Sequence, residues 1–155
     1  MIQCIVSDLS RVIVFPAEET AGSLNTLYRD RTSSGASFAD VFTLNIPLLE
    51  VYRKLELPVI VFTSGISIPE DPYVKQQLSG IVDRIITAAE IGAAKDDAET
   101  YTKLADYLGY PAEAMLFIDD SPENCRAAGE AGLTAVVYTS VSDVSDALRS
   151  HQLSE

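Results

Sequence analysis

The sequence contains few of the residues on which several protein classes depend. Its two cysteines, Cys4 and Cys125, are too few for a disulfide framework and fit a reducing compartment. Only 11 lysines and arginines stand against 23 acidic residues, and the net charge of −12 repels nucleic acid and anionic lipid surfaces. No apolar run approaches the roughly 20 residues that a spanning helix needs. We therefore expect neither nucleic acid nor a membrane as a partner.

The remaining composition is that of a folded globular protein. The chain has 155 residues, of which 47% are hydrophobic and 22% charged, enough for one domain with a buried core. It begins on a strand-like segment with no basic region before it, so we expect no signal peptide and a cytoplasmic location. A small phosphorylated metabolite remains compatible with the net charge, because a bound cation can reverse the charge of one cleft.

Short apolar runs alternate with helical patterns along most of the chain. Strand-like runs occupy residues 2–7, 59–62, 84–87, 114–118 and 133–138. Helical patterns occupy residues 47–57, 71–78, 97–108, 121–131 and 142–149. This alternation is typical of βαβ units. It predicts a Rossmann-like α/β fold, a three-layer α/β/α sandwich around a parallel sheet.

One segment interrupts the alternation. A weak apolar run at residues 12–15 stops at Pro16, and the residues that follow are polar and rich in Ser, Thr and Gly. We predict a single domain over residues 1–155, with its core in 1–15 and 45–150 and a small insertion at about 16–44. Ser23, Asn25 and Arg29 are the polar candidates if this insertion touches a ligand.

Polar side chains stand where several predicted strands end. Asp8 follows the first strand, Thr63-Ser64-Gly65 the second, and Asp119-Asp120 a late one, while Lys95 precedes a helix. The carboxyl ends of parallel strands share one edge of a sheet, where ligands bind. Carboxylates that converge at one site repel one another unless a cation neutralises them, and hard oxygen ligands suit Mg²⁺. A metal beside a carboxylate nucleophile, with a lysine and hydroxyl donors, is what phosphoryl transfer requires.

Each of these residues also has a structural interpretation when taken alone. Asp119, Asp120 and Ser121 favour the start of a helix electrostatically and as caps. Thr63-Ser64-Gly65 is an ordinary turn after a strand. Lys95 fits a solvated position, although its charge is slightly unfavourable near a helix start. The combination, rather than any single member, favours a functional site.

The order of these residues resembles the four motifs of the haloacid dehalogenase-like (HAD) hydrolases. Asp8-Leu9-Ser10 comes first, then Thr63, then Lys95, then Asp119-Asp120 with the residues after it. Residues 115–133 (MLFIDDSPENCRAAGEAGL) are especially similar to the fourth motif of that family's phosphatases. The resemblance covers nearly the whole chain except residues 17–44, which it implies to be a short cap that leaves the site fairly open.

The resemblance implies a metal site and a nucleophile. Asp8 would form an aspartyl-phosphate. Its side chain, the backbone carbonyl of Ser10 and the side chain of Asp120 would bind Mg²⁺. Asp119 would be a further ligand or would support one.

The resemblance also implies a phosphate site. Thr63 and the backbone amides of Ser64 and Gly65 would hold the phosphoryl group. Lys95 would neutralise and orient the nucleophile, and Asn124 would hydrogen-bond within the site. The activity implied is that of a phosphatase acting on a small phosphomonoester.

Ser10 departs from the family pattern. Most phosphatases of the family carry Asp-x-Asp, whose second aspartate is the general acid and base, and here that position is a serine followed by Arg11. A hydroxyl without an activating base is a poor proton donor at neutral pH, so about 10²- to 10⁴-fold in rate is at stake. The dehalogenases of the family carry Asp-x-Tyr, but the Asp119-Asp120 pair favours metal and phosphate over a halide. Arg11 either reaches an anionic substrate, covers the entrance of the site or lies in solvent, and the solvated position is favoured.

Two alternatives to a phosphatase follow. A binding or regulatory protein on the same fold would hold Mg²⁺ and phosphate without turnover. A receiver-like signalling domain also uses acids, a hydroxyl and a lysine on a parallel sheet. There, however, the acid pair follows the first strand, whereas Asp119-Asp120 follows a late one.

Overall fold

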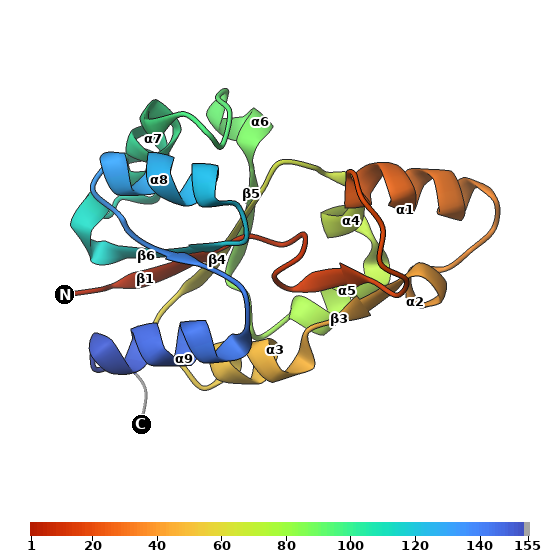
Figure 1. The fold of residues 1–155 in the computed structure, drawn as a ribbon, viewed down its shortest axis with the longest axis horizontal. Helices are drawn as coiled ribbons and strands as arrows, with labels where there is room; N and C mark the ends of the chain where they lie inside the picture. The colour runs from red at the N-terminus through yellow and green to blue at the C-terminus, as the bar shows by residue number, and fades with distance from the viewer. Residues whose placement is uncertain (154–155) are drawn as a thin grey trace.

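A central parallel sheet organises the molecule. In the computed structural model, which describes residues 1–153, five strands form this sheet in the order β5-β4-β1-β6-β7, with every neighbouring pair parallel. The strands are β1 (Cys4–Ser7), β4 (Val59–Thr63), β5 (Arg84–Thr87), β6 (Met115–Asp119) and β7 (Thr134–Val137). Helices cover both faces of the sheet (Figure 1). This confirms the predicted Rossmann-like sandwich; the last two residues of the predicted domain, 154 and 155, lie outside the described residues.

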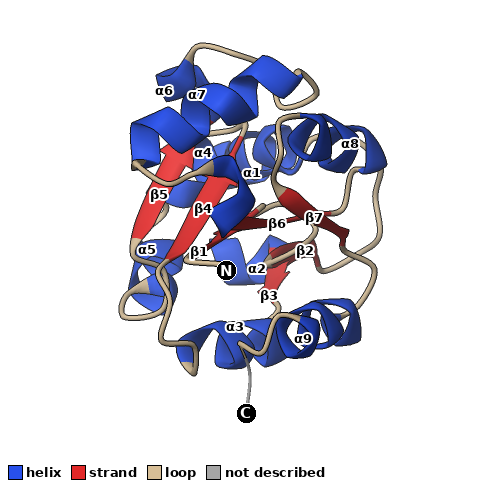
Figure 2. Ribbon diagram, turned by 90° about the vertical axis from the view of Figure 1, so that its left-hand side faces the viewer, coloured by secondary structure: helices blue, strands red, loops and turns tan. Residues whose placement is uncertain are grey.

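Two helical layers enclose the sheet. Figure 2 shows α6 (Ala88–Ile91), α7 (Ala98–Leu108) and α8 (Pro122–Glu130) on one face, and α3 (Ile46–Arg53) and α9 (Val141–Ser150) on the other. Local signals set several boundaries: Asp97 caps the start of α7, and Gly109 ends it in a left-handed conformation, with φ of 81°. Ser121 caps α8, whose first residue is Pro122. A short 3₁₀ helix (Ala112–Ala114) leads into β6.

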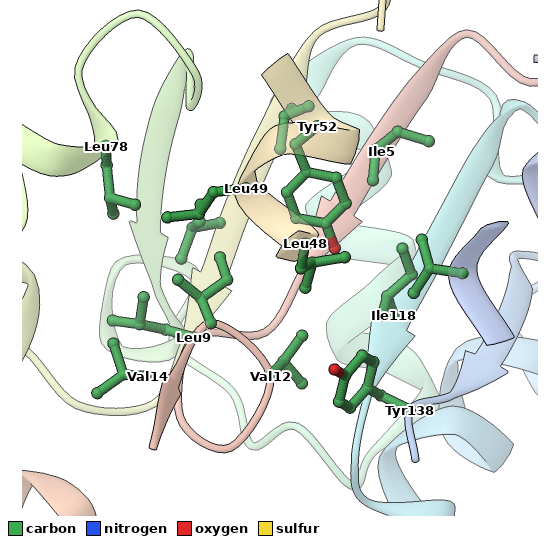
Figure 3. Close-up of a cluster of buried hydrophobic side chains, with 14 of the residues drawn as sticks. Ile5, Leu9, Val12, Val14, Leu48, Leu49, Tyr52, Leu78, Ile118 and Tyr138 are labelled. Atoms are coloured by element: carbon green, nitrogen blue, oxygen red, sulfur yellow. The ribbon is translucent and has the colours of Figure 1, made fainter. Parts of the chain in front are cut away.

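Side chains of the central strands alternate between two hydrophobic clusters. In β1, Cys4 and Val6 pack toward Tyr101 and Leu104 on the α7 side, whereas Ile5 packs toward α3. The second cluster includes Ile5, Leu48, Tyr52 and Ile118 (Figure 3). Both cysteines are buried and free. No helix within residues 1–153 is long and apolar enough to cross a membrane.

Residues 14–44 form an appendage that shares the core. Strand β2 (Val14–Pro16) includes Pro16 and pairs antiparallel with β3 (Phe42–Leu44), which the polar sequence pattern does not predict. Between them lie α1 (Leu24–Ser33) and α2 (Phe38–Val41). Leu24, Phe38 and Phe42 are buried in the same cluster as α5 (Pro72–Leu78). The insertion therefore packs on the main body through its apolar residues.

The strand order decides between two parallel-sheet topologies. Numbered along the chain, the five strands lie in the order 3-2-1-4-5, which is the Rossmann order, whereas receiver domains have the order 2-1-3-4-5. The receiver alternative is therefore wrong for this chain. The order reverses between β1 and β6, and ligands bind beyond the carboxyl ends of the strands at such a reversal.

Candidate active site

Asp8 lies at the centre of the sheet edge, directly after β1. Its backbone N–H donates to Ile118 O at 2.8 Å, which joins the end of β1 to the end of β6. Its carboxylate Oδ1 accepts hydrogen bonds from the Leu9 N–H at 2.8 Å and from Lys95 Nζ at 3.0 Å. The residue is only 7% exposed, and that exposed part lines a cleft. A buried carboxylate that is held by one oxygen leaves the other oxygen for a ligand.

Asp119 and Asp120 follow β6 and have different surroundings. Asp119 is fully buried: Oδ1 accepts from the Ser121 N–H at 2.9 Å, and Oδ2 accepts from Lys95 Nζ at 2.8 Å and Asn124 Nδ2 at 3.2 Å. Asp120 is half-buried and lines the cleft. Both oxygens of Asp119 already accept hydrogen bonds, which fits the supporting role expected for it, and its role as a metal ligand stays a prediction.

Lys95 is the cation at the centre of the site. It is 6% exposed, and besides the two carboxylates its Nζ donates to Phe62 O at 3.1 Å. The rings of Phe62 and Phe117 lie beneath the Nζ atom, with centroids at 5.4 and 5.8 Å. Burial alone lowers the pKa of Lys95, but Asp8 and Asp119 outweigh it and raise the pKa above its ordinary value. Lys95 is therefore a fixed positive charge, not the solvated residue that its sequence position allows.

Two tyrosine hydroxyls position these charged groups. Tyr101 Oη donates to Lys95 O at 2.6 Å and fixes the loop that carries the lysine. Tyr52 Oη donates to Ser7 Oγ at 2.8 Å, and this hydroxyl donates in turn to Asp8 O. Both tyrosines were recognisable in the sequence only as members of apolar helix faces.

Three carboxylates gather close enough to hold one cation. Asp8, Asp119 and Asp120 each offer an oxygen, and these atoms lie within 4.8 Å of one another. Burial is the main cause that raises the pKa of Asp8; Lys95 opposes this rise, and the charges of Asp119 and Asp120 add to it. Burial and the charge of Asp119 likewise raise the pKa of Asp120. One lysine thus leaves the cluster short of positive charge. An all-oxygen donor set with excess negative charge fits Mg²⁺.

The cleft above these carboxylates has a volume of about 390 Å³. The predicted phosphate-binding residues Thr63, Ser64 and Gly65, from the end of β4, line it together with the acidic cluster. Ser10 is partly exposed and also lines it, so the structure brings together all the residues proposed from the sequence. They are Asp8, Ser10, Thr63, Ser64, Gly65, Lys95, Asp119, Asp120 and Asn124.

The insertion supplies another wall of the cleft. The cleft is lined there by Ser23, Leu24, Asn25 and Arg29, which belong to α1 and its N-cap. Arg11 lines it too, with a left-handed backbone (φ 62°). Its guanidinium donates to Thr20 O at 2.7 Å and Gly22 O at 3.0 Å. The side chain thus ties the first motif to the insertion at the edge of the cleft, and a contact of Arg11 with an anionic substrate stays a prediction.

Comparison with known proteins shows the family. Residues 43–132, more than half of the chain, match the family model of the haloacid dehalogenase-like hydrolases. The chain belongs to this family. The matched segment contains Thr63, Lys95, Asp119 and Asp120 but begins after Asp8, so the placement of Asp8 in this HAD-like site rests on the geometry described above.

Curated relatives of this HAD-like protein include phosphatases. It is 24% identical over 126 residues to enolase-phosphatase E1 of Aquifex aeolicus, covering 79% of this chain and 55% of that protein. It is 32% identical over 101 residues to phosphatase MT3486 of Mycobacterium tuberculosis, covering 64% and 46%. The chain thus spans about half the length of the curated relatives it matches.

Solved structures share the fold over nearly their whole length. A HAD-superfamily hydrolase of subfamily IA from Geobacter sulfurreducens superposes with a TM-score of 0.64 at 13% identity, covering 95% of this chain and 96% of that one. A HAD family enzyme from Bacteroides thetaiotaomicron, solved with magnesium and inorganic phosphate, gives 0.59 at 15% identity, covering 87% and 93%. At these identities the likeness establishes the fold.

Proposed function

We propose that this HAD-like protein is a Mg²⁺-dependent phosphatase that transfers the phosphoryl group of a small phosphomonoester to Asp8. The observation that carries the proposal is the buried Asp8 carboxylate, held on Oδ1 by Leu9 N–H and Lys95 Nζ, at the floor of a cleft with two further carboxylates. The phosphatase names of two curated relatives support the same reaction class.

The residues divide the chemistry between them. Asp8 Oδ2, which is not engaged by these donors, attacks phosphorus, and the bond from phosphorus to the alcohol oxygen breaks as the new bond forms. Water then cleaves the acyl phosphate, which releases inorganic phosphate and restores the carboxylate. Thr63 and the amides of Ser64 and Gly65 hold the phosphoryl oxygens, and Lys95 keeps Asp8 oriented.

Asp8, Asp120 and the Ser10 carbonyl would hold Mg²⁺, and Asp119 would fix Lys95 and Asn124 beside them. The metal would supply positive charge that balances the carboxylates and the phosphate. A small phosphorylated metabolite suits the cleft volume of about 390 Å³, and the net charge of −12 disfavours nucleic acid and membranes as partners. The two free cysteines support a cytoplasmic location.

A second candidate function rests on Ser10. The structure gives this residue no hydrogen-bonded base within residues 1–153, so nothing turns its hydroxyl into a proton donor for the departing alcohol. A protein with this site can bind Mg²⁺ and phosphate as a regulatory or binding module. Substrates whose leaving groups need no proton are affected least, so the two functions separate experimentally.

The test is phosphate release from an activated aryl phosphate and from a panel of sugar phosphates, with and without Mg²⁺. The native chain is compared with Asp8→Asn and Ser10→Asp. Mg²⁺-dependent turnover that disappears in Asp8→Asn supports the phosphatase. Absence of turnover in both the native chain and Ser10→Asp, with Mg²⁺ binding intact, rejects it in favour of the binding module.

A further inference from the structure

Asn25 is a buried amide from the insertion whose orientation is fixed. It lies in the first turn of α1 and is 7% exposed. Its Oδ1 accepts a hydrogen bond from the Ile68 N–H at 2.9 Å, at the start of α4 (Ser67–Glu70). A backbone N–H can only donate, so the atom that faces it must be the oxygen and the other must be the amide nitrogen. The two donor hydrogens of Asn25 therefore lie on the side away from Ile68.

That amide nitrogen lies against the phosphate-binding loop. A Cβ atom at Gly65 would be only 2.1 Å from Asn25 Nδ2, so Gly65 is the residue type that lets the amide approach. The backbone of Gly65 does not have positive φ, which leaves this close approach as the reason for a glycine here. Asn25 and the loop are thus fitted to one another at the wall of the cleft.

The Nδ2 group has no protein acceptor among the described residues. Among the described residues, the only hydrogen bond of the Asn25 side chain is the one that Oδ1 accepts. Every fully buried side-chain nitrogen and oxygen in residues 1–153 has a hydrogen-bond partner, so the unpaired Nδ2 is not fully buried. The nitrogen therefore reaches the cleft, which Asn25 lines. The donor is therefore aimed into the cleft without a protein acceptor, and an oxygen of an anionic ligand bound there would supply one.

We propose that Asn25 donates a hydrogen bond to an oxygen of the phosphoryl group held by the Thr63-Ser64-Gly65 loop. This rests on the phosphate site proposed above and holds for either candidate function. The insertion then completes the phosphate site, because α1 brings to it a donor that the sheet edge lacks. Two other contacts fix α1 in place: Tyr28 Oη donates to Asp71 Oδ2 at 2.6 Å, and Arg29 donates to Ser67 Oγ at 3.3 Å.

Binding of inorganic phosphate to the Mg²⁺-containing protein tests the proposal without requiring turnover. The dissociation constant is measured by calorimetry and by the rise in melting temperature with phosphate concentration. We expect Asn25→Ala to weaken phosphate binding about 10- to 100-fold, the range for a hydrogen bond to a charged group. Mg²⁺ binding, measured separately, should change less than twofold.

Two further variants separate ligand contact from anchoring. Tyr28→Phe removes another anchor of α1 but no group that lines the cleft, so it should bind phosphate like the native chain. Asn25→Asp keeps an acceptor for the Ile68 N–H and replaces the donor by an acceptor, so it should lose phosphate binding while retaining the fold and Mg²⁺. This variant covers the case in which Asn25→Ala fails to fold.

The outcomes are distinct. If folded Asn25→Ala binds phosphate within twofold of the native chain, or if Tyr28→Phe weakens binding as much as Asn25→Ala, the assignment of Asn25 is wrong and the phosphate site stands. If the native chain binds no phosphate in the presence of Mg²⁺, the proposed function fails and the assignment fails with it.

Discussion

The substitution Asp8→Asn should stabilise the metal-free protein. Charged groups up to 4.8 Å apart repel by at least about 3.5 kcal/mol at an effective dielectric constant near 20, and Asp8 faces two such carboxylates. Its attraction to Lys95, whose Nζ lies 3.0 Å from Asp8 Oδ1, contributes about 5.5 kcal/mol of favourable energy at the same dielectric constant. The charged form of Asp8 is thus unfavourable by about 1–2 kcal/mol before its burial is counted.

The effect should depend on pH in a defined direction. Burial, with the neighbouring acids, raises the pKa of Asp8 from 3.8 to about 8, so its folded form binds a proton more tightly than the unfolded chain does. The native protein therefore loses stability relative to Asp8→Asn as the pH rises from about 4 to about 8. At pH 7 we expect the variant to melt about 3–8 °C higher in the presence of a chelator.

The assay is thermal unfolding across this pH range, with EDTA and with Mg²⁺. Mg²⁺ should raise the melting temperature of the native chain and have little effect on Asp8→Asn. Glu113→Gln, at an exposed acid, controls for the change in net charge. A variant less stable than the native protein at pH 7 without metal, or a difference that does not vary with pH, would refute this account of the acidic cluster.

Three other substitutions probe the same site. Ser10→Asp should raise turnover of alkyl phosphates by about 10²- to 10⁴-fold and that of activated aryl phosphates much less; equal gains on both would contradict a role in proton transfer. Lys95→Met should cost about 3 kcal/mol or more in urea unfolding at pH 7, because two buried carboxylates lose their cation; a neutral effect would show that they are already protonated. Gly65→Ala should destabilise the protein by about 1–3 kcal/mol through its contact with Asn25, and Asn25→Ala in the same chain should recover most of that loss; additive losses in the double mutant would place the strain elsewhere.

The sequence predicts the sheet edge well because two independent signals coincide there. Strands such as β1 and β6 are short apolar runs followed by acids, and Asp8 in particular has little structural reason to follow a buried strand. Parallel strands then force these acids to the same edge. The position of Asp8 beside Asp119 and Asp120 follows from topology alone.

Contacts made across the chain are absent from local patterns. The elements α2, α4 and α6 have four residues each, too few to show a period, and β3 depends on pairing with β2. Asn25 and Gly65 are 40 positions apart in the sequence, and neither residue type by itself predicts a contact with the other. The short elements and the contacts between packed polar side chains could therefore be identified only from the structure.

The energetics of the acidic cluster connect the two candidate functions. A cluster of two buried carboxylates, one half-buried carboxylate and one buried lysine is unfavourable for folding, and a well-packed apolar replacement would be more stable. The cluster becomes favourable when a cation neutralises it, and a bound phosphate then satisfies the donors around it. Both the phosphatase and the binding module need that ligand-bound state, and they differ in whether the departing alcohol receives a proton, the step for which Ser10 replaces the usual aspartate. Measuring Mg²⁺-dependent phosphate binding first, and the effect of Ser10→Asp on turnover second, therefore separates a site that binds from a site that reacts.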